Sequence, residues 1–308
     1  MSGGASVVEL SGVSRWYGNV VAVNDVSMTL GPGVTGLLGP NGAGKSTLLH
    51  MISGFLPPSR GTVTLDGTPT WRHPAIYRRL GLVPEREAVH GFLSGYDFVL
   101  ASARLHKLAD PAGAARRAVA LVGMEEAQHR RIGTYSKGMR QRIRVAAALV
   151  HDPAVLVLDE PFNGMDPRQR LHMMQVLQRL GDAGRTVLFS SHILEEVAQL
   201  SGTVQVIVAG RLAASGDYRT IRRLMTHRPH VFTIHSSDDR RLAVALLAKE
   251  PVLGVELDPA GGLTVRTSDY GTFTRALPAV ALAEGVRVTR VLPTDESLES
   301  VFSYLVGS

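Results

Sequence analysis

Short runs of apolar residues alternate with helical patterns between residues 34 and 208. Five runs have the composition of strands that are buried on both faces, at residues 34–38, 80–83, 155–158, 187–190 and 204–208. Strands that alternate with helices are typical of an α/β unit with a mainly parallel sheet. Three earlier runs, at residues 7–10, 20–22 and 26–30, predict a flanking antiparallel sheet.

A helical pattern replaces the strands between about residue 87 and residue 149, so we expect a helical insert within a first domain of residues 1–225. The pattern breaks at Thr226-His227-Arg228-Pro229-His230 and starts afresh. Residues 229–308 then follow the order strand, helix, strand, strand, helix, strand, which is the ferredoxin-like arrangement of a small α+β domain. A closing helix is expected at residues 297–305.

Composition narrows the chemistry. The 308 residues are 44% hydrophobic and 19% charged, the balance of a folded globular chain, and they contain no cysteine. Disulfides, thiol nucleophiles and cysteine-ligated metals are therefore excluded. The sequence contains no run of about 18 apolar residues that could span a membrane, and the first ten residues lack the pattern of a signal peptide. The net charge of +6 divides into +8 for residues 1–225 and −2 for residues 226–308.

A glycine-rich loop connects the first buried run to a helical segment. The eight residues at 39–46 fit the pattern G-x-x-x-x-G-K-[ST] of a phosphate-binding loop. Glycines let successive N–H groups converge on phosphate oxygens, the lysine reaches the outer phosphates, and the serine hydroxyl binds Mg²⁺. The candidate phosphate-binding residues are Gly39, Pro40, Asn41, Gly42, Ala43, Gly44, Lys45, Ser46 and Thr47.

Two carboxylates follow the strand predicted at residues 155–158. Asp159 and Glu160 would lie at the carboxyl edge of the sheet, where nucleotides bind in such folds. Asp159 is the candidate Mg²⁺ partner, and Glu160 is the candidate base that polarises an attacking water. Taken alone, the pair also fits an exposed strand end with incidental acids.

The segment Tyr135-Ser136-Lys137-Gly138-Met139-Arg140-Gln141 begins a helical pattern shortly before this acidic strand. With the phosphate loop, it makes the chain resemble the ATP-binding subunit of an ABC transporter, and Ser136 and Gly138 match the family's signature loop. The resemblance implies an ABC-type ATPase fold, with ATP and Mg²⁺ as cofactors. It also implies a head-to-tail dimer in which the signature loop contacts ATP held by the other subunit.

Other family positions occur in order. Tyr17 matches the aromatic residue that stacks on adenine, with Trp16 as the fallback and a core role as the alternative. Asp166, in Asn163-Gly164-Met165-Asp166, matches the loop that crosses the dimer interface; a capped turn before Pro167 is the alternative. His192, after Ser190-Ser191, matches the histidine that contacts the γ-phosphate.

The chain departs from the common family pattern at residue 85. Glu85 stands where many relatives carry glutamine, so it keeps an oxygen for Mg²⁺ but loses an amide donor. Lys137 and Met139 replace a glycine and a glutamine of the common signature loop. These variants and the terminal segment 297–302 resemble the ABC-2-type export subfamily, which includes drug, antibiotic and polysaccharide exporters.

The resemblance implies a second ATP-binding subunit and an integral membrane permease as partners, at the cytoplasmic face of the membrane. The helical insert would dock the permease, with Phe92, Leu93 and Tyr96 as candidate contacts or, alternatively, as core residues. An ABC-type ATPase that acts on nucleic acid or ribosomes is the alternative function, although we expect no nucleic acid because Arg140, Arg142 and Arg144 spread around a helix. A third hypothesis treats the tail as a ligand-sensing or dimerising module.

Overall fold

A computed structural model describes residues 7–86, 89–217, 219–221, 229–259, 261–294 and 302. The chain forms two compact units, Met1–Ser215 and Gly216–Ser308. Apart from residue 302, the closing helix expected at residues 297–305 lies outside the described residues, as does most of the expected boundary region. Among the described residues, none of the helices combines the length and the apolar character needed to cross a membrane.

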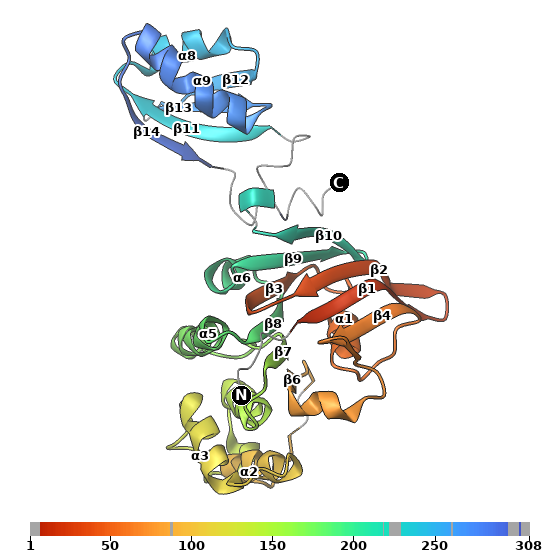
Figure 1. The fold of residues 1–308 in the computed structure, drawn as a ribbon. Helices are drawn as coiled ribbons and strands as arrows, with labels where there is room; N and C mark the ends of the chain where they lie inside the picture. Colours follow the sequence, from red (N-terminus) through yellow and green to blue (C-terminus); the bar gives the residue numbers. More distant parts are fainter. Residues whose placement is uncertain are drawn as a thin grey trace. The chain divides into compact units, whose positions relative to one another are not determined.

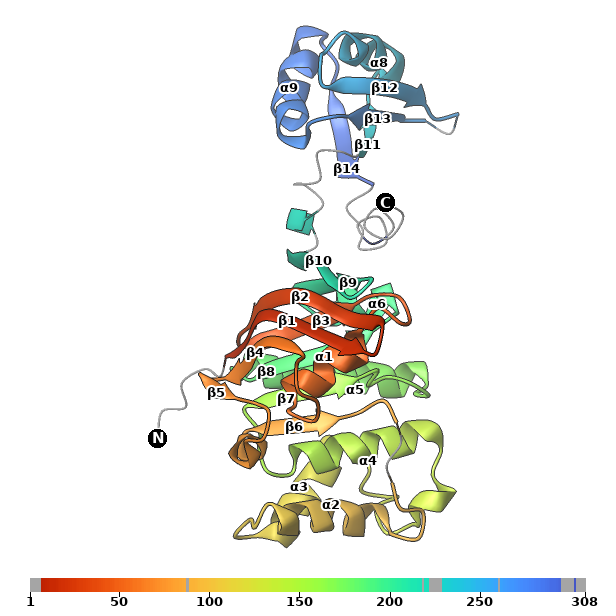
Figure 2. The same cartoon turned by 90° about the vertical axis from the view of Figure 1, so that its right-hand side faces the viewer.

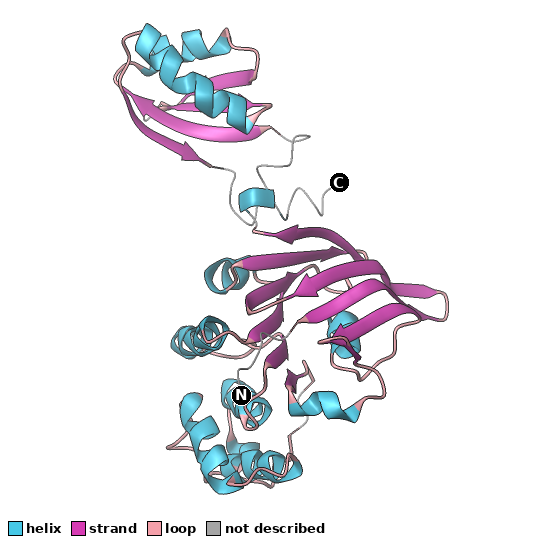
Figure 3. Ribbon diagram, viewed as in Figure 1, coloured by secondary structure: helices cyan, strands magenta, loops and turns pink. Residues whose placement is uncertain are grey.

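A six-stranded sheet forms the centre of the first unit, in the order β10-β9-β3-β8-β7-β6 (Figures 1 and 3). Strands β6, β7, β8, β3 and β9 run parallel to one another, which confirms the predicted parallel sheet. The strands span Gly33–Leu38 (β3), Leu80–Val83 (β6), Val155–Asp159 (β7), Thr186–Ser191 (β8), Thr203–Val208 (β9) and Arg211–Gly216 (β10). Strand β10 was not predicted because its short sequence, RLAASG, lacks an apolar run.

A four-stranded antiparallel sheet, in the order β2-β1-β4-β5, flanks the parallel sheet. Its strands span Val8–Tyr17 (β1), Val20–Leu30 (β2), Arg60–Leu65 (β4) and Thr68–Pro69 (β5). The prediction of two short strands within residues 20–30 was wrong, because β2 is continuous. Asp25 has a φ of +53° at an irregularity in the β1–β2 pairing, so the alternation of apolar residues is interrupted although the strand is not.

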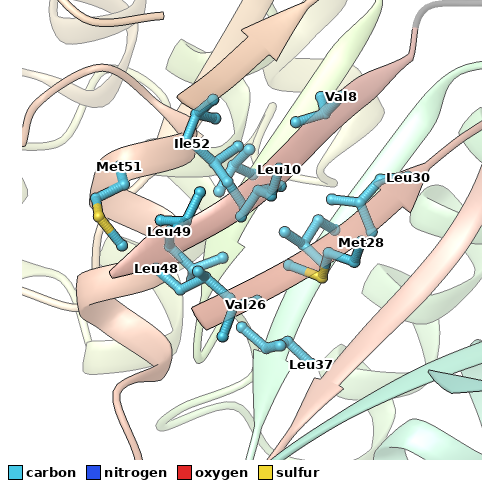
Figure 4. Close-up of a cluster of buried hydrophobic side chains, with 14 of the residues drawn as sticks. Val8, Leu10, Val26, Met28, Leu30, Leu37, Leu48, Leu49, Met51 and Ile52 are labelled. Carbon is cyan, nitrogen blue, oxygen red and sulfur yellow. The ribbon is translucent and has the colours of Figure 1, made fainter. Parts of the chain in front are cut away.

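The main core lies between the two sheets and contains helix α1 (Lys45–Ile52) (Figure 4). Helices α5 (Pro167–Asp182) and α6 (Leu194–Leu200) pack against β3 and β8 of the parallel sheet (Figure 1). A short 3₁₀ helix at Pro74–Arg78 precedes β6. The buried side chains between the sheets come from β1, β2, β4, α1 and the parallel strands and include Val8, Leu10, Val26, Leu37, Leu48, Ile52 and Val157. The loop before α1 is thereby held between two sheets.

Three helices replace the strands between β6 and β7: α2 (Gly95–Leu105), α3 (Pro111–Leu121) and α4 (Lys137–Leu149), with a 3₁₀ turn at Ile132–Thr134. They contact one another, and α4 also packs on β6 (Figure 2). The approach of α4 to β6 is close, because a Cβ on Gly81 would lie 2.4 Å from the carbonyl oxygen of Ala148. Glycine at position 81 therefore allows α4 to lie directly on the sheet.

The second unit contains an antiparallel sheet in the order β12-β13-β11-β14, with two helices that share its core. Its elements are β11 (His230–Ser236), α8 (Asp239–Leu247), β12 (Val252–Leu257), β13 (Leu263–Thr267), α9 (Tyr270–Ala283) and β14 (Val288–Pro293). This order and pairing confirm the predicted ferredoxin-like arrangement. Phe232, Leu242 and Phe273 are fully or almost fully buried where the helices meet the sheet.

The approach of α4 to β6 gives a stability prediction. Gly81→Val should destabilise the first unit by about 2 kcal/mol, because the new side chain must displace helix backbone rather than a flexible side chain. Thermal unfolding followed by circular dichroism measures the loss. Gly202→Val is the matched control, since a Cβ at this exposed glycine meets no atom within 4 Å. Equal melting temperatures for the two variants would contradict the packing.

Candidate functional site

The glycine-rich loop lies where the two sheets meet. A Cβ on Gly39 would lie 2.3 Å from the carbonyl oxygen of Ile207 on β9, and a Cβ on Gly44 would lie 2.3 Å from that of Ala22 on β2. Gly44 also has a φ of +100°, which L side chains rarely adopt. Both sheets thus approach the loop so closely that these two positions require glycine. The loop leads directly into α1, whose first turn offers free N–H groups to an anion.

Lys45 begins α1 and turns back over the loop. Its Nζ donates hydrogen bonds to the carbonyl oxygens of Gly39, at 2.7 Å, and of Pro40, at 3.2 Å. The side chain is buried, and burial lowers the pKa of its ammonium group against the opposing influence of Glu160, Asp159 and Glu85. Its attraction to three carboxylates places the lysine between the loop and the acidic strand ends.

Asp159 and Glu160 follow one another at the end of β7 and are connected by Ser190 on the neighbouring strand β8. The Ser190 hydroxyl donates to Asp159 Oδ1 at 2.5 Å and accepts from the backbone N–H of Glu160 at 2.9 Å. His192 Nδ1 lies 2.9 Å from Glu160 Oε1. Glu160 has a φ of +50°, a sparsely populated conformation for a residue other than glycine, and such conformations gather at functional sites. Ser190 was part of a recognised motif, but its contact across the sheet is not encoded in the local pattern.

Lys45, Asp159 and Glu160 line a cleft of about 380 Å³, whereas Ser190 and His192 do not belong to its lining. Its lining brings together the candidate phosphate-binding and acidic residues Asn41, Gly42, Gly44, Lys45, Ser46, Thr47, Glu85, Asp159 and Glu160, with Ala22 as an unpredicted member. Asp159 Oδ2 is buried and has no hydrogen-bond partner among the described residues. A carboxylate oxygen left unpaired beside a serine hydroxyl and further carboxylates suits Mg²⁺, which prefers oxygen ligands. The residues present therefore fit this cation.

Tyr17 lies outside this cleft, at the exposed end of β1. The Arg15 guanidinium lies 4.9 Å from the centre of the Tyr17 ring and donates to the carbonyl oxygen of Pro57 at 3.1 Å. One face of the ring is thus covered by a cation. Tyr17 and Trp16 are 47% and 42% exposed, which excludes the alternative that either is a core aromatic.

Ser136, Gly138 and Asp166 form a separate cluster. The Ser136 hydroxyl caps α4 by accepting from Met139 N–H at 3.2 Å, and the Asp166 carboxylate caps α5 by accepting from Gln169 N–H at 2.8 Å. A Cβ on Gly138 would lie 2.7 Å from the carbonyl oxygen of Gly164, so the two helix starts pack against each other. None of the three residues lines the cleft at the glycine-rich loop.

A buried glutamate connects helix α5, which begins after Asp166, to Ser191, the residue before His192. Glu196 on α6 accepts from the Ser191 hydroxyl at 2.6 Å and pairs with Arg170 on α5 at 3.5 Å. Burial raises the pKa of the Glu196 carboxyl, and the hydrogen bond from Ser191 opposes the rise. Sequence reasoning missed this network. Its only local signal is an acidic residue on the apolar face of a short helix.

A second cleft, of about 430 Å³, lies where the helical insert meets the sheet. We call it the insert groove; it is lined by Phe55, Tyr77, Leu80, Gly81, Leu82, Val83, Pro84, Phe98, Ser102, His106, Arg144, Ala147, Ala148 and His151. The expected contact residues Phe92, Leu93 and Tyr96 are absent from this lining. Phe92 is 72% exposed, and Tyr96 packs beside His129.

Comparisons with known proteins agree with this geometry. Residues 23–163 match the family model described as ABC transporter. The linearmycin resistance ATP-binding protein LnrL of Bacillus subtilis is 35% identical over 98% of this chain and 98% of its own. The daunorubicin/doxorubicin resistance ATP-binding protein DrrA of Streptomyces peucetius is 33% identical over 97% of this chain and 92% of its own.

Solved structures are similar to the first unit. The structure of an ATP-binding subunit of an ABC transporter, at 26% identity, covers 70% of this chain and 92% of that chain with a TM-score of 0.65. The structure of a dimeric bacterial ABC transporter cassette covers 68% of this chain and 98% of that chain with a TM-score of 0.64. At 21% identity, this likeness shows the fold alone.

The histidines of the insert groove give a pH prediction. His106 and His151 stack with ring centroids 3.7 Å apart, and burial together with His106 lowers the pKa of His151 to about 4. In the unfolded chain this pKa is about 6.5. Because protonation then favours unfolding, the stability that neutral His151 provides above pH 6.5 should be lost as the pH falls towards 4.

Between these pH values, the wild type should lose about 2 kcal/mol more free energy of unfolding than His151→Gln. A fall in pKa from 6.5 to about 4 corresponds to about 3 kcal/mol, and partial exposure of the ring reduces this. Urea unfolding of both proteins at several pH values measures the difference. Parallel pH profiles would contradict the lowered pKa.

Proposed function

The chain belongs to the ATP-binding proteins of the ABC transporter family, and we propose that it hydrolyses ATP to drive a separate membrane permease that works as an exporter. The observation that carries the proposal is the cleft in which the glycine-rich loop and Lys45 face Asp159 and Glu160. This cleft combines donors for phosphate with carboxylates for a metal ion and for water, which are the parts that phosphoryl transfer requires.

Binding depends on the loop and Lys45. Backbone N–H groups of residues 41–47 bind the phosphates, and the Lys45 ammonium exchanges loop carbonyls for phosphate oxygens. Ser46, Asp159 and Glu85 would hold Mg²⁺, and Asp159 Oδ2 is the oxygen without a partner. A bound Mg²⁺ would neutralise charge on the phosphates. Tyr17, which pairs with Val20 of strand β2, offers adenine an exposed aromatic ring.

Hydrolysis depends on Glu160 and His192. The Glu160 side chain is mostly buried, which leaves its carboxylate shielded from bulk water but in contact with the cleft. We assign it the role of orienting and polarising the attacking water. His192, 2.9 Å away and 44% exposed, would hold Glu160 in place and contact the γ-phosphate. Ser190 fixes the backbone of Glu160 and the Asp159 carboxylate together.

A second copy of the chain would complete the site. Members of this family dimerise as ATP-binding cassettes. Ser136, Gly138 and Asp166 gather outside the cleft, and the start of α4, which is capped by the neutral Ser136 hydroxyl, suits an anion. In a head-to-tail dimer, Ser136 and Gly138 would face the γ-phosphate held by the other copy, and Asp166 would lie where the loop crosses the dimer interface. The Ser136 hydroxyl uses only an acceptor position as a helix cap, so its proton stays available for a phosphate oxygen.

The insert groove supports docking of the permease. It lies between helices α2 and α4 and strand β6, and aromatic side chains contribute to its lining. Phe92, Leu93 and Tyr96 do not line this groove. The candidate contacts with the permease are therefore Phe55, Tyr77 and Phe98. Relatives named for bacitracin transport and for linearmycin and daunorubicin resistance support an export role. Docking would hold the chain at the cytoplasmic face of the membrane.

No observation favours a nucleic-acid partner. Arg140 donates to the carbonyl oxygen of Tyr135, Arg142 to that of Gly123 and Arg144 to that of Arg86. Because these guanidinium groups bind the chain's own carbonyls, they do not present a basic stripe to phosphates. The hypothesis that the tail senses a ligand or promotes dimerisation stays a prediction.

The role of Glu160 gives the main test. Glu160→Gln should lower the ATP hydrolysis rate of the full-length chain at least about a hundredfold, because an amide cannot accept a proton from water. ATP binding should persist, and size-exclusion chromatography with ATP should show a stabilised dimer. Glu195→Gln, an exposed change at the start of α6, is the control. A Glu160→Gln variant that hydrolyses ATP at the wild-type rate would contradict the assignment.

Glu85 gives a test for the metal. Glu85→Gln keeps one oxygen but removes a negative charge from the cleft, so the half-saturating Mg²⁺ concentration for ATP hydrolysis should rise several-fold. A Mg²⁺ titration at saturating ATP measures it. Glu9→Gln on β1 is the control for the change of charge. If the two variants titrate alike, Glu85 is not a metal ligand.

A further inference from the structure

The insert groove and the cleft at the glycine-rich loop share one wall. Pro84 lines the insert groove, and the next residue, Glu85, lines the cleft at the glycine-rich loop. Both belong to the turn that follows β6, which we call the Glu85 turn (residues 84–86). A displacement of this turn therefore changes the shape of both clefts.

Arg144 holds the Glu85 turn from both ends. Its guanidinium donates through Nη2 to the carbonyl oxygens of Pro84 and of Arg86, the latter at 2.8 Å. Nη1 donates to Gln141 Oε1 at 2.6 Å, one helical turn earlier on α4. Arg144 is only 6% exposed and also lines the insert groove. A planar guanidinium can bridge two carbonyl groups in this way, whereas a shorter or apolar side chain cannot.

Arg144 also belongs to the helix that begins at Ser136. The α4 helix is 13 residues long and continuous, so its ends move together. Its first turn packs on Gly164 through Gly138, and its last turn lies on Gly81 of β6. One rigid element therefore connects the Glu85 turn to the cluster of Ser136, Gly138 and Asp166, which we call the Ser136 cluster and which would face a second copy in the proposed dimer.

We propose that Arg144 is a positioning residue that locks the Glu85 turn to α4, so that the insert groove, the metal-binding carboxylate and the Ser136 cluster move as one unit. The roles of the two clefts, in permease docking and in metal binding, rest on the proposed function. The connection between the Glu85 turn and α4 rests only on the hydrogen bonds of Arg144. A docked permease segment that moves Pro84 would thereby shift Glu85 and Ser136 together.

Hydrogen–deuterium exchange of the full-length chain tests the lock. Without nucleotide, Arg144→Met should speed exchange of the amides of Val83, Glu85 and Arg86 about tenfold, because the turn loses its hydrogen bonds to α4. Arg144→Lys should keep part of the protection, since an ammonium group still donates to carbonyl oxygens. Arg142→Met is the matched control. It removes a partly buried guanidinium from the same helix, but this guanidinium donates to the carbonyl oxygen of Gly123 and does not contact the Glu85 turn.

The coupling itself has a separate measurement. With Mg²⁺ and a non-hydrolysable ATP analogue, the wild type should gain protection at residues 39–47, 82–86 and 136–140. In Arg144→Met, residues 39–47 should remain protected while the gain at residues 136–140 falls several-fold. A general fold defect would instead reduce protection at all three segments.

Two results would overturn the proposal. In one, Arg144→Met exchanges like the wild type at the Glu85 turn. In the other, Arg142→Met and Arg144→Met speed exchange equally along α4, which would mean that either change simply loosens the insert. If the analogue protects residues 39–47 in none of the proteins, the proposed function fails, while the exchange without nucleotide still decides the role of Arg144.

Discussion

The glycine-rich loop is held between two sheets, and the arrangement of the first unit follows from that constraint. Strand β9 of the parallel sheet approaches Gly39, and strand β2 of the antiparallel sheet approaches Gly44. Each strand comes so close that a Cβ on the glycine would collide with a backbone carbonyl oxygen of the strand. Gly210 N–H also donates to the carbonyl oxygen of Ala43 at 3.1 Å. The loop therefore has its shape before a ligand arrives, and binding does not have to order it.

Electrostatics explain why such a site needs further positive charge. Glu85, Asp159 and Glu160 surround the single ammonium group of Lys45, and burial disfavours that charge. Triphosphate would add several negative charges to a cleft whose carboxylates already outnumber its lysine. A divalent cation at Asp159 and the start of α4 in a second copy would supply the compensation that Lys45 alone cannot. The chemistry of the cleft thus favours a metal ion and a dimer for the same reason.

Local pattern was sufficient for the parts of the site that lie within one segment. The loop at residues 39–46 and the acids at residues 159–160 are recognisable because they follow apolar strands, and parallel strands bring their carboxyl ends to one edge. The contacts of Ser190 with Asp159 and of Arg144 with Pro84 join residues that are 31 and 60 positions apart, so they depend on packing, which the local pattern does not encode. The interruption at Asp25 likewise hid a continuous strand, because an irregular pairing breaks the alternation that predicts strands.

In the proposed dimer, each chain would contribute two incomplete surfaces rather than one complete site. The cleft holds the groups that we propose to bind phosphate and activate water, whereas Ser136 and Asp166 lie at helix starts and do not line it. Capping gives both residues a structural role in the isolated chain, so their geometry is maintained without a partner. The Glu196 bridge between α5 and Ser191 joins the helix that begins after Asp166 to the strand end that carries His192. In the proposed dimer, a contact at Asp166 would reach Ser191, the residue before His192, through the Arg170–Glu196 ion pair and the Glu196–Ser191 hydrogen bond, which would tie hydrolysis to assembly.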